Sequence, residues 1–391
     1  MNKHPWRIIC LGGGPAGLYF SILMKKADPA HEVTVLDRNR PDDTFGWGIV
    51  FSDQTMAGFR DADGEVVDEI ERSFRHWDDI DVFFKGRRIT SGGHGFCGIA
   101  RMKLLEILQR RARALGVTLQ YETEFADPDA YARDYDLVVG ADGVFSTTRG
   151  RHVAHFNPRI DLRTCRFIWL GTRRKLDAFT FAFKETPWGW FNLHAYRFDA
   201  EWSTFIVETP EDTWLKAGID KMEQGESVAF CERLFADLLD GHALVSNARH
   251  LRGSAVWLKF NRVLCERWFK DNIVLIGDAA HTAHFAIGSG TKLAMEDAIA
   301  LAGVLQGTDG DVATRLARYQ AARETEALKL QSAARNRMTW FEDIERYVTL
   351  EPEQFAYALL TGSQRVGHAS LKARDPGYIA GVERWFAQRC G

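Results

Sequence analysis

The sequence predicts an α/β fold in which a doubly wound, mostly parallel sheet is interleaved with a mostly antiparallel sheet and followed by carboxy-terminal helices. Two observations favour this fold class. Short apolar strands near both ends of the chain alternate with helices, which is typical of β-α-β units. The middle of the chain instead carries successive strands rich in aromatic and β-branched residues, separated by polar turns.

The parallel sheet is predicted from short apolar strands and the helices between them. The strands cover residues 7–11, 32–36, 117–121, 136–140 and 272–276, with helices over 16–26 and 101–115. Gly116 follows the second helix, where glycine is typical of a helix end. Glycine-rich turns follow the strands, as expected where a parallel sheet binds a ligand at the carboxyl ends of its strands.

The antiparallel sheet is predicted to interrupt the parallel one. Its strands cover residues 166–172, 178–184, 190–197 and 203–209, with a helix at about 226–240. Helical periodicity returns over 291–340, and smaller helices are expected over 352–391. The predicted division is a discontinuous nucleotide-binding domain at 1–80, 97–160 and 265–325, a substrate-binding sheet domain at 81–96 and 161–264, and a helical region at 326–391.

The composition argues against several function classes. A net charge of −3 offers no basic excess for binding nucleic acid. No apolar stretch is long enough to span a bilayer and no signal-peptide pattern is present, so we expect a cytoplasmic protein without a membrane partner. The six cysteines are scattered without metal-ligand spacing, which predicts reduced thiols and no metal site. We expect a monomer or a homodimer.

The segment IICLGGGPAG predicts a dinucleotide site at the first strand-to-helix turn. In this G-x-G-x-x-G pattern Gly12 permits a tight turn, Gly14 lets the backbone approach a pyrophosphate, and Gly17 allows close packing of helix and strand. Asp37 ends the second strand twenty residues after Gly17, where a carboxylate can accept the ribose hydroxyls. The predicted cofactor site also includes Pro15, Ala16 and Arg38.

Two further segments indicate a flavin dinucleotide. LVVGADGVFSTTRGR carries Asp142-Gly143 followed by Arg149. IVLIGDAAHTAHFAIGSGTK carries Gly277-Asp278 at a strand end, where a carboxylate can bind the ribityl hydroxyls. The same segment opens a helix whose N-terminus can stabilise negative charge on the flavin ring. The residues assigned to that helix N-terminus are Gly288, Gly290 and Thr291.

With these three segments the chain resembles the group A flavoprotein aromatic hydroxylases, the family typified by para-hydroxybenzoate hydroxylase. The resemblance covers essentially the whole fold and implies a Rossmann-type domain with tightly bound FAD. Arg101 matches the family arginine near the FAD pyrophosphate, and Trp47 is expected beside the cofactor. The resemblance implies that NADH or NADPH is a transient reductant, that O2 is a co-substrate, and that an aromatic ring is hydroxylated through a C4a-hydroperoxyflavin.

One departure from the family pattern points to a narrower branch. His284-Phe285 stands where many relatives carry a Pro-Pro pair, and Lys292 stands at the place of an asparagine. With the segments at 44–55, 191–208 and 332–343, the chain is similar to the salicylyl-CoA 5-hydroxylases and to the monooxygenase part of 2-aminobenzoyl-CoA monooxygenase/reductase. This implies 5-hydroxylation of an aryl-CoA thioester such as salicylyl-CoA, para to the hydroxyl. Hydroxylation of 2-aminobenzoyl-CoA or of a free aromatic or indole compound, and a flavin module without turnover, stay open.

The aromatic substrate is expected between the antiparallel sheet and the flavin. His194 and Tyr196 face the same way on one strand and, with His284, are the candidate catalytic residues. Phe285 and Ile287 are expected to contact the substrate. Each histidine has a structural alternative, most of all His281, which can simply support its turn. Candidate partners of CoA phosphates, none of them assigned to the site because a solvated helix face is the better explanation for each, are Arg335, Arg337, Arg365, Lys372 and Arg374.

Overall fold

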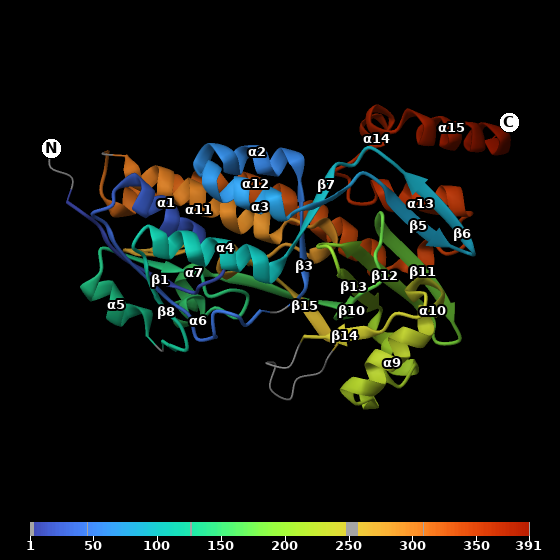
Figure 1. Ribbon diagram of the computed structural model, residues 1–391, viewed down its shortest axis with the longest axis horizontal. Helices are drawn as coiled ribbons and strands as arrows, with labels where there is room; N and C mark the ends of the chain where they lie inside the picture. The colour runs from blue at the N-terminus through green and yellow to red at the C-terminus, as the bar shows by residue number, and fades with distance from the viewer. Residues whose placement is uncertain (1–3, 45, 126, 248–256, 308, 391) are drawn as a thin grey trace.

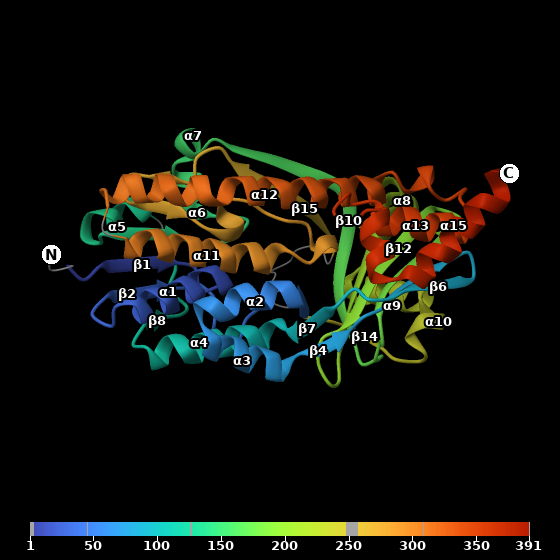
Figure 2. The same cartoon turned by 90° about the horizontal axis from the view of Figure 1, so that it is seen from above.

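The computed structural model describes residues 4–44, 46–125, 127–247, 257–307 and 309–390. A parallel sheet and a larger antiparallel sheet lie towards opposite ends of an elongated molecule (Figures 1 and 2). The amino terminus lies at the parallel-sheet end and the carboxy terminus at the antiparallel-sheet end. Within the described ranges, no helix has the length and apolar character needed to cross a membrane.

The parallel sheet has the strand order β16-β17-β9-β1-β2-β8. Its strands are β1 (Arg7–Leu11), β2 (Glu32–Leu36), β8 (Thr118–Gln120), β9 (Leu137–Gly140), β16 (Phe269–Lys270) and β17 (Ile273–Leu275). All neighbours pair in parallel except the edge strand β16. The five predicted strands are therefore confirmed. The apolar residues of β1, β2, β9 and β17 are buried on both faces, which explains why these strands appear in the sequence as continuous apolar runs.

Helices cover the parallel sheet and place their N-termini near the carboxyl ends of its strands. α1 (Pro15–Ala27) packs against both α4 (Arg101–Ala114) and α11 (Gly290–Gln306). Gly116 follows α4 with a φ of +82°, a left-handed conformation that ends the helix as predicted. The remaining helices of this part are α2 (Asp53–Ala62), α3 (Gly64–Ser73), α5 (Pro128–Asp134), α6 (Thr147–Arg151) and α7 (Val153–Phe156).

The antiparallel sheet has the order β14-β10-β13-β12-β11-β5-β6, with β15 pairing to β10. Its strands are β5 (Ile80–Phe84), β6 (Arg87–Ser91), β10 (Pro158–Thr172), β11 (Phe179–Thr186), β12 (Gly189–Arg197), β13 (Ser203–Thr209), β14 (Leu244–Ser246) and β15 (Leu258–Cys265). The four predicted strands are present, but β10 begins eight residues before the predicted 166. This first half pairs with β15 and exposes Ile160 and Leu162, so it lacks the buried pattern that predicts a strand. A small sheet of β3 (Gly48–Ser52), β4 (Arg75–Trp77) and β7 (Phe96–Ala100) lies between the two larger ones.

The two faces of the antiparallel sheet bury different elements. One face packs Leu193 and Ala195 against α9 (Gln224–Leu234) and α10 (Ala236–Leu239), so the predicted helix at 226–240 is two helices. The other face packs an aromatic cluster against α12 (Val312–Glu342) and α13 (Pro352–Thr361). The proposed division at 325/326 falls within α12, which extends from one large sheet to the other (Figure 2). The other helices are α8 (Glu211–Lys216), α14 (His368–Arg374) and α15 (Pro376–Cys390).

Candidate active site

The glycine turn between β1 and α1 leaves an open space in front of the helix. Gly12 has a φ of +119°, and a Cβ there would lie 2.2 Å from the carbonyl oxygen of Ala141. A Cβ on Gly17 would lie 2.2 Å from the carbonyl oxygen of Gly12. At Gly14, which precedes the first residue of α1, a Cβ would meet nothing within 4 Å. The free N–H groups and positive dipole end of α1 therefore face a space that fits a diphosphate.

Asp37 lies against this turn rather than pointing away from it. One carboxylate oxygen accepts a hydrogen bond from the backbone N–H of Gly13 at 2.7 Å, and the other accepts from that of Asn39 at 2.8 Å. Asp37 therefore holds the glycine turn in place and keeps lone pairs available for a ribose. Pro15 and Ala16 form the first turn of α1, and Arg38 is exposed.

The polar atoms of Asp142 and Arg149 form hydrogen bonds within the protein. Asp142 accepts hydrogen bonds from the Ser146 hydroxyl at 2.6 Å and from the Thr148 backbone N–H at 2.9 Å, which stabilises the start of α6. Arg149 is buried and donates to the carbonyl oxygens of Val144 and Ala279. This pair fastens the loop after β9 to the turn after β17. Their role in binding the cofactor stays a prediction, because the contacts they make here are structural.

Asp278 and Arg101 come from separate elements, and their charges act on each other. Asp278 lies in the short helix η3 (Gly277–Ala279), and Arg101 is the first residue of α4. The protein that surrounds the Asp278 carboxylate raises its pKa, and the positive charge of Arg101 partly offsets this rise. The side chain of Asp278 is nevertheless in contact with solvent. Burial likewise lowers the pKa of Arg101, whose Nε donates to the Thr44 hydroxyl at 2.9 Å. The Asp278 carboxylate is thus accessible at the carboxyl end of β17, where a ligand of ribityl hydroxyls is expected.

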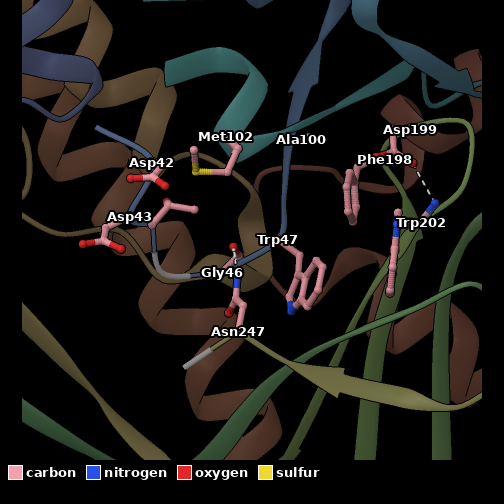
Figure 3. A pocket seen from close by; sticks show the side chains of 11 residues that line it. Asp42, Asp43, Gly46, Trp47, Ala100, Met102, Phe198, Asp199, Trp202 and Asn247 are labelled. Atoms are coloured by element: carbon pink, nitrogen blue, oxygen red, sulfur yellow. Dashed lines mark hydrogen bonds between the residues drawn. The ribbon is translucent and has the colours of Figure 1, made fainter. Parts of the chain in front are cut away.

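A cavity of about 570 Å³ lies beside Arg101 (Figure 3). This volume suits a flat ring system. Trp47 and Trp202 stack on one side with ring centroids 5.1 Å apart and planes inclined by 22°. The lining residues come from the loop after β2, the junction of β7 and α4, the β12–β13 turn and the end of β14: Asp42, Asp43, Thr44, Gly46, Trp47, Ala100, Met102, Phe198, Asp199, Trp202 and Asn247.

The loop that carries Trp47 is fastened to the antiparallel sheet. The Tyr196 hydroxyl donates to the Gly48 carbonyl oxygen at 2.8 Å, and the Gly48 N–H donates to the Thr204 hydroxyl at 3.0 Å. Burial raises the pKa of Tyr196 above the ordinary phenol value. The hydroxyl of Tyr196 is therefore protonated and positions the Trp47 loop from β12.

His194 and His284 lie on either side of a buried carboxylate, Glu208. Nε2 of His194 is 3.0 Å from one Glu208 oxygen, and Nε2 of His284 is 3.7 Å from the other. Asn192 contacts both His194 and Glu208. Nδ1 of His284 accepts from the Ala286 N–H at 3.2 Å. Burial alone raises the pKa of Glu208, but the two histidines and Asn192 outweigh it, and its pKa lies below the ordinary value.

Phe285 connects this cluster with the face of the antiparallel sheet. Its ring lies 5.6 Å from His194, 4.8 Å from Phe167 and 5.8 Å from Trp169, measured between centroids. His194 and Tyr196 lie on the same face of β12, as predicted, and that face also carries Phe179 and Phe181. Aromatic rings thus surround the His194–Glu208–His284 cluster, which excludes water from it.

The segment after Phe285 leads to the N-terminus of α11. Gly288 has a φ of +60°, and its Cβ position is 3.6 Å from the Cβ of Val50 on β3. Gly290 and Thr291 form the first turn of α11, whose N-terminus is directed towards β3. Ile287 is half-buried and packs with Ala283, Leu293 and Leu330 beneath that helix.

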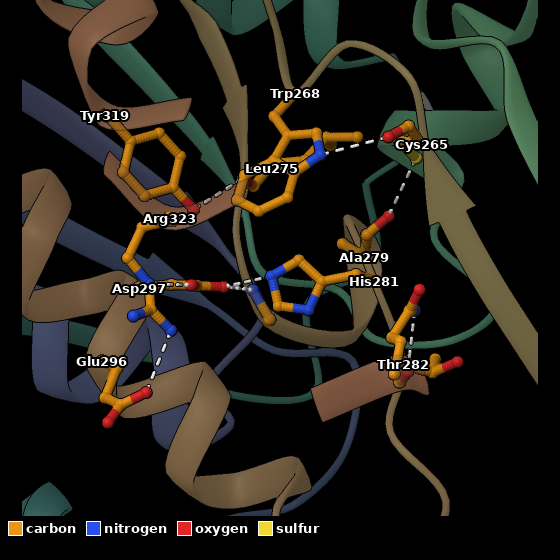
Figure 4. A network of polar contacts seen from close by, with 12 residues as sticks. Cys265, Trp268, Leu275, Ala279, His281, Thr282, Glu296, Asp297, Tyr319 and Arg323 are labelled. Carbon is orange, nitrogen blue, oxygen red and sulfur yellow. Dashed lines mark hydrogen bonds and ion pairs between the residues drawn. The ribbon is translucent and has the colours of Figure 1, made fainter. Parts of the chain in front are cut away.

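Behind the Gly277 turn lies a buried ionic network (Figure 4). Asp297 on α11 is 0% exposed and accepts from the Gly277 N–H at 3.0 Å. Nε2 of His281 lies 2.8 Å from the same carboxylate, and Nε of Arg323 on α12 donates to it at 2.9 Å. Burial by itself raises the pKa of Asp297, but His281 and Arg323 outweigh it, so this pKa is lower than usual. His281 therefore supports the turn, which is the structural alternative considered for it.

The structure places the glycine turn, Asp37, Asp142 and Gly277-Asp278 at the carboxyl ends of neighbouring strands of the parallel sheet. The three candidate catalytic residues are instead buried and line no part of the open cavity. Sequence reasoning missed Glu208, Asp297 and Arg323. A signal existed for Glu208, because it is a charged residue in a strand whose other residues are all buried. In the described part of the chain, no group of three or more His, Cys, Asp or Glu residues is arranged to hold a metal ion.

The buried imidazole of His284 makes stability depend on pH. Burial lowers the pKa of His284 from 6.5 to about 4, with Glu208 opposing and His194 and Arg163 reinforcing the shift. Between these values the unfolded chain binds a proton that the folded chain does not, so stability falls as pH decreases from 6.5 to 4. We expect His284→Asn to reduce the slope of the unfolding free energy against pH, between pH 4 and 6.5, by about 1.4 kcal/mol per pH unit.

Urea unfolding at a series of pH values measures this slope. The matched control is His76→Asn, which removes an exposed histidine and should leave the slope unchanged. Equal slopes for His284→Asn and the unmodified protein would show that His284 is protonated in the folded state.

Comparisons with known proteins agree with this geometry. A family model described as "FAD binding domain" matches residues 6–334. The chain is 40% identical over 390 residues to a salicyloyl-CoA 5-hydroxylase from a Streptomyces species, covering 97% of this chain and 74% of the relative. It is 35% identical to a 3-hydroxy-4-methyl-anthranilyl-[aryl-carrier protein] 5-monooxygenase from Streptosporangium sibiricum, covering 86% of this chain and 89% of the relative.

A solved structure shows the same fold. The crystal structure of 2-methyl-3-hydroxypyridine-5-carboxylic acid oxygenase superimposes with a TM-score of 0.69 at 18% identity, covering 95% of this chain and 98% of that chain. The resemblance inferred from the glycine turn, Asp142-Gly143 and Gly277-Asp278 is therefore confirmed. The chain belongs to the FAD-binding family of group A flavoprotein aromatic hydroxylases, which are monooxygenases that use FAD, NAD(P)H and O2.

Proposed function

We propose that the protein hydroxylates an aryl-CoA thioester such as salicylyl-CoA at the ring position para to the hydroxyl. The observation that carries this proposal is the 40% identity over 97% of the chain to a salicyloyl-CoA 5-hydroxylase. The His284-Phe285 pair, which departs from the wider family pattern, lies among the aromatic rings beside Glu208 and supports the same reading. Since the reductant is NAD(P)H, we also propose that the protein acts in the cytoplasm.

The residues at the sheet edge fit FAD. The space at Gly14 would take the diphosphate, Arg101 and Asp278 would contact the diphosphate and ribityl chain, and the N-terminus of α11 would face the flavin ring. When bound, FAD accepts electrons from NAD(P)H and activates O2 for transfer of one oxygen atom to the substrate ring.

The chain itself would position the ring and hold a proton. Because a carboxylate only accepts hydrogen bonds, Glu208 favours a proton on Nε2 of His194 and leaves the lone pair on Nδ1. That Nδ1 is buried and makes no hydrogen bond with any residue that the structure describes. We propose that it accepts the proton of the ring hydroxyl, which raises electron density at the para carbon, while Glu208 stabilises the imidazolium.

His194 is the best placed of the three candidate catalytic residues for this role. Nδ1 of His284 already accepts from Ala286, and the hydroxyl of Tyr196 donates to Gly48. Both would act as positioning residues, His284 for the Phe285 segment and Tyr196 for the Trp47 loop. Phe167, Trp169 and Phe285 would enclose the ring and exclude water.

An assay with paired substrates tests the proposed function. FAD is confirmed by the absorption spectrum, and O2 and NADH or NADPH consumption are measured with salicylyl-CoA, 2-aminobenzoyl-CoA, free salicylate, free 2-aminobenzoate and indole. We expect coupled consumption and a hydroxylated thioester with salicylyl-CoA, and at least tenfold lower kcat/KM with the free compounds. Turnover of a free compound as efficient as that of its thioester would overturn the proposal, as would the absence of any hydroxylated product.

A second candidate is an aryl thioester carried by a protein. It is favoured by the 35% identity to a monooxygenase whose name specifies an aryl-carrier-protein substrate. The two candidate substrates share the aryl thioester and differ in the carrier bound to its sulfur, which is CoA in one and a protein in the other. A salicylyl group on a purified aryl-carrier protein, assayed beside salicylyl-CoA, distinguishes them by kcat/KM.

A further inference from the structure

Three arginines lie where the β10–β15 ribbon approaches α12. Asp161 on β10 pairs with Arg262 on β15, and Arg159 pairs with Leu264. Because cross-strand partners share a face and every second residue returns to that face, Arg159, Asp161 and Arg262 lie on one side of the ribbon. Arg335 lies on α12, which packs against β10, and its charge acts on Arg262.

The carboxylates near this side are already engaged by a fourth arginine. Arg163 donates to Asp161 at 2.9 Å and pairs with Glu342 on α12. Thr339 and Glu342 both contact Arg163, and Arg335 lies one and two turns before them on α12, so this face of the helix is turned towards the ribbon.

Arg159, Arg262 and Arg335 make no ion pair with any carboxylate in the described part of the chain. Nε of Arg262 is buried and has no hydrogen-bond partner there. Burial lowers the pKa of Arg262, and the charges of Arg335, Arg163 and Arg159 add to this effect against that of Asp161. A group of guanidinium groups held together without enough counter-charge is stabilised by a bound anion.

This arginine face, defined as Arg159, Arg262 and Arg335, begins beside the aromatic site. Phe260 precedes Arg262 by two residues on the same side of β15, and its ring lies 4.7 Å from that of His284. Two residues of a strand span about 7 Å. Arg163 is also among the charges that lower the pKa of His284. The ribbon therefore leads from the aromatic site towards the arginine face.

We propose that the arginine face binds the phosphate groups of the CoA portion of the substrate, with the pantetheine arm lying along β15 past Phe260. This inference rests on the proposed aryl-CoA function. The thioester must lie beside the aromatic ring, whereas the diphosphate and 3′-phosphate lie at the far end of the pantetheine arm. Guanidinium groups bind phosphate oxygens through paired hydrogen bonds, and clustered arginines suit a ligand with several phosphates.

Of the five cations considered from the sequence, Arg335 alone belongs to this face. Arg337 is buried and donates to the Leu359 carbonyl oxygen, and Lys372 pairs with Glu383. Arg365 lies 3.4 Å from the Ser289 hydroxyl at the start of α11, and the backbone of Arg374 packs against Gly93.

Steady-state kinetics of the holoenzyme with shortened thioesters test the proposal. The variants are Arg262→Gln and Arg159→Gln, and the matched control is Arg384→Gln, which removes an exposed charge on α15. We expect each ribbon variant to raise KM for salicylyl-CoA about tenfold while kcat and FAD content stay unchanged. With salicylyl-pantetheine, which lacks all phosphates, KM should already be high and should be the same for all the proteins.

Two further measurements separate the possible phosphate sources and the possible failures. Binding of 3′,5′-ADP, measured by calorimetry without turnover, should weaken about tenfold in Arg262→Gln, and KM for NADPH and NADH should not change. A raised KM for NADPH in place of salicylyl-CoA, or equal KM values for salicylyl-CoA and salicylyl-pantetheine, would overturn the phosphate site. Efficient turnover of free salicylate without any effect of CoA would instead overturn the proposed function.

Discussion

Replacement of Gly14 by valine is expected to abolish FAD binding while leaving the chain folded. The backbone of Gly14 has φ −77° and ψ −179°, an extended conformation that valine adopts without strain. A Cβ there meets no protein atom within 4 Å, so the new side chain occupies only the space in front of α1. We expect FAD to bind at least 100-fold more weakly, equivalent to about 2.7 kcal/mol, with loss of activity in proportion. Flavin absorbance of the purified protein and calorimetric titration with FAD measure the effect.

Two companion variants sharpen this test. Gly58→Val places the same side chain in open space on α2 and should keep both FAD and activity. Gly12→Ala should not yield folded protein, because its φ is +119° and its Cβ would lie 2.2 Å from a backbone oxygen. Normal FAD binding by Gly14→Val would mean that the diphosphate does not lie at the N-terminus of α1.

Asp297→Asn is expected to destabilise the fold more than any single change on the surface. Asp297 is completely buried and is the acceptor for Arg323, His281 and the Gly277 N–H. An amide there leaves the Arg323 guanidinium, which is 8% exposed, without its buried counter-charge. Removing one partner of a buried ion pair costs about 3 kcal/mol or more. Urea unfolding of the holoenzyme measures this loss, and we expect weaker FAD binding because the Gly277 turn carries Asp278.

The neighbouring residue provides a matched control. Glu296→Gln also removes one negative charge from α11, but Glu296 is partly exposed and pairs with Lys292 as well as Arg323. We expect it to change the unfolding free energy by no more than about 1 kcal/mol. If Asp297→Asn and Glu296→Gln unfold at the same urea concentration, the buried network does not stabilise the turn.

The cofactor turn could be predicted from the sequence because its constraints are local. Gly12 is required by its own φ of +119° and Gly17 by its contact with the Gly12 carbonyl oxygen in the same strand-turn-helix unit, and these constraints leave a spacing that can be recognised. The strands of the parallel sheet were predictable for a related reason, since burial on both faces makes them continuous apolar runs. The first half of β10 was missed because its register depends on β15, almost a hundred residues later.

The ionic part of the site depends on packing between distant elements. Asp297 on α11 and Arg323 on α12 are 26 residues apart. Glu208 on β13 contacts His284, which lies in the segment between β17 and α11. No spacing rule brings these side chains together, because their contact follows from the way the helices and the antiparallel sheet pack. At Asp142 the residue itself could be singled out from the sequence. The hydrogen bonds that its oxygens accept from Ser146 and Thr148 could not be predicted.

α12 has a mechanical consequence for how a substrate can enter. Its 31 residues form a rod about 46 Å long, which is joined towards its middle to the cofactor turn through Arg323 and at its carboxy-terminal end to the β10–β15 ribbon through Glu342. A continuous helix anchored at both places acts as a brace, because bending it would break backbone hydrogen bonds. The two sheets are therefore not free to open about a hinge, and we expect access to the ring site to depend on displacement of short surface segments against a stiff frame.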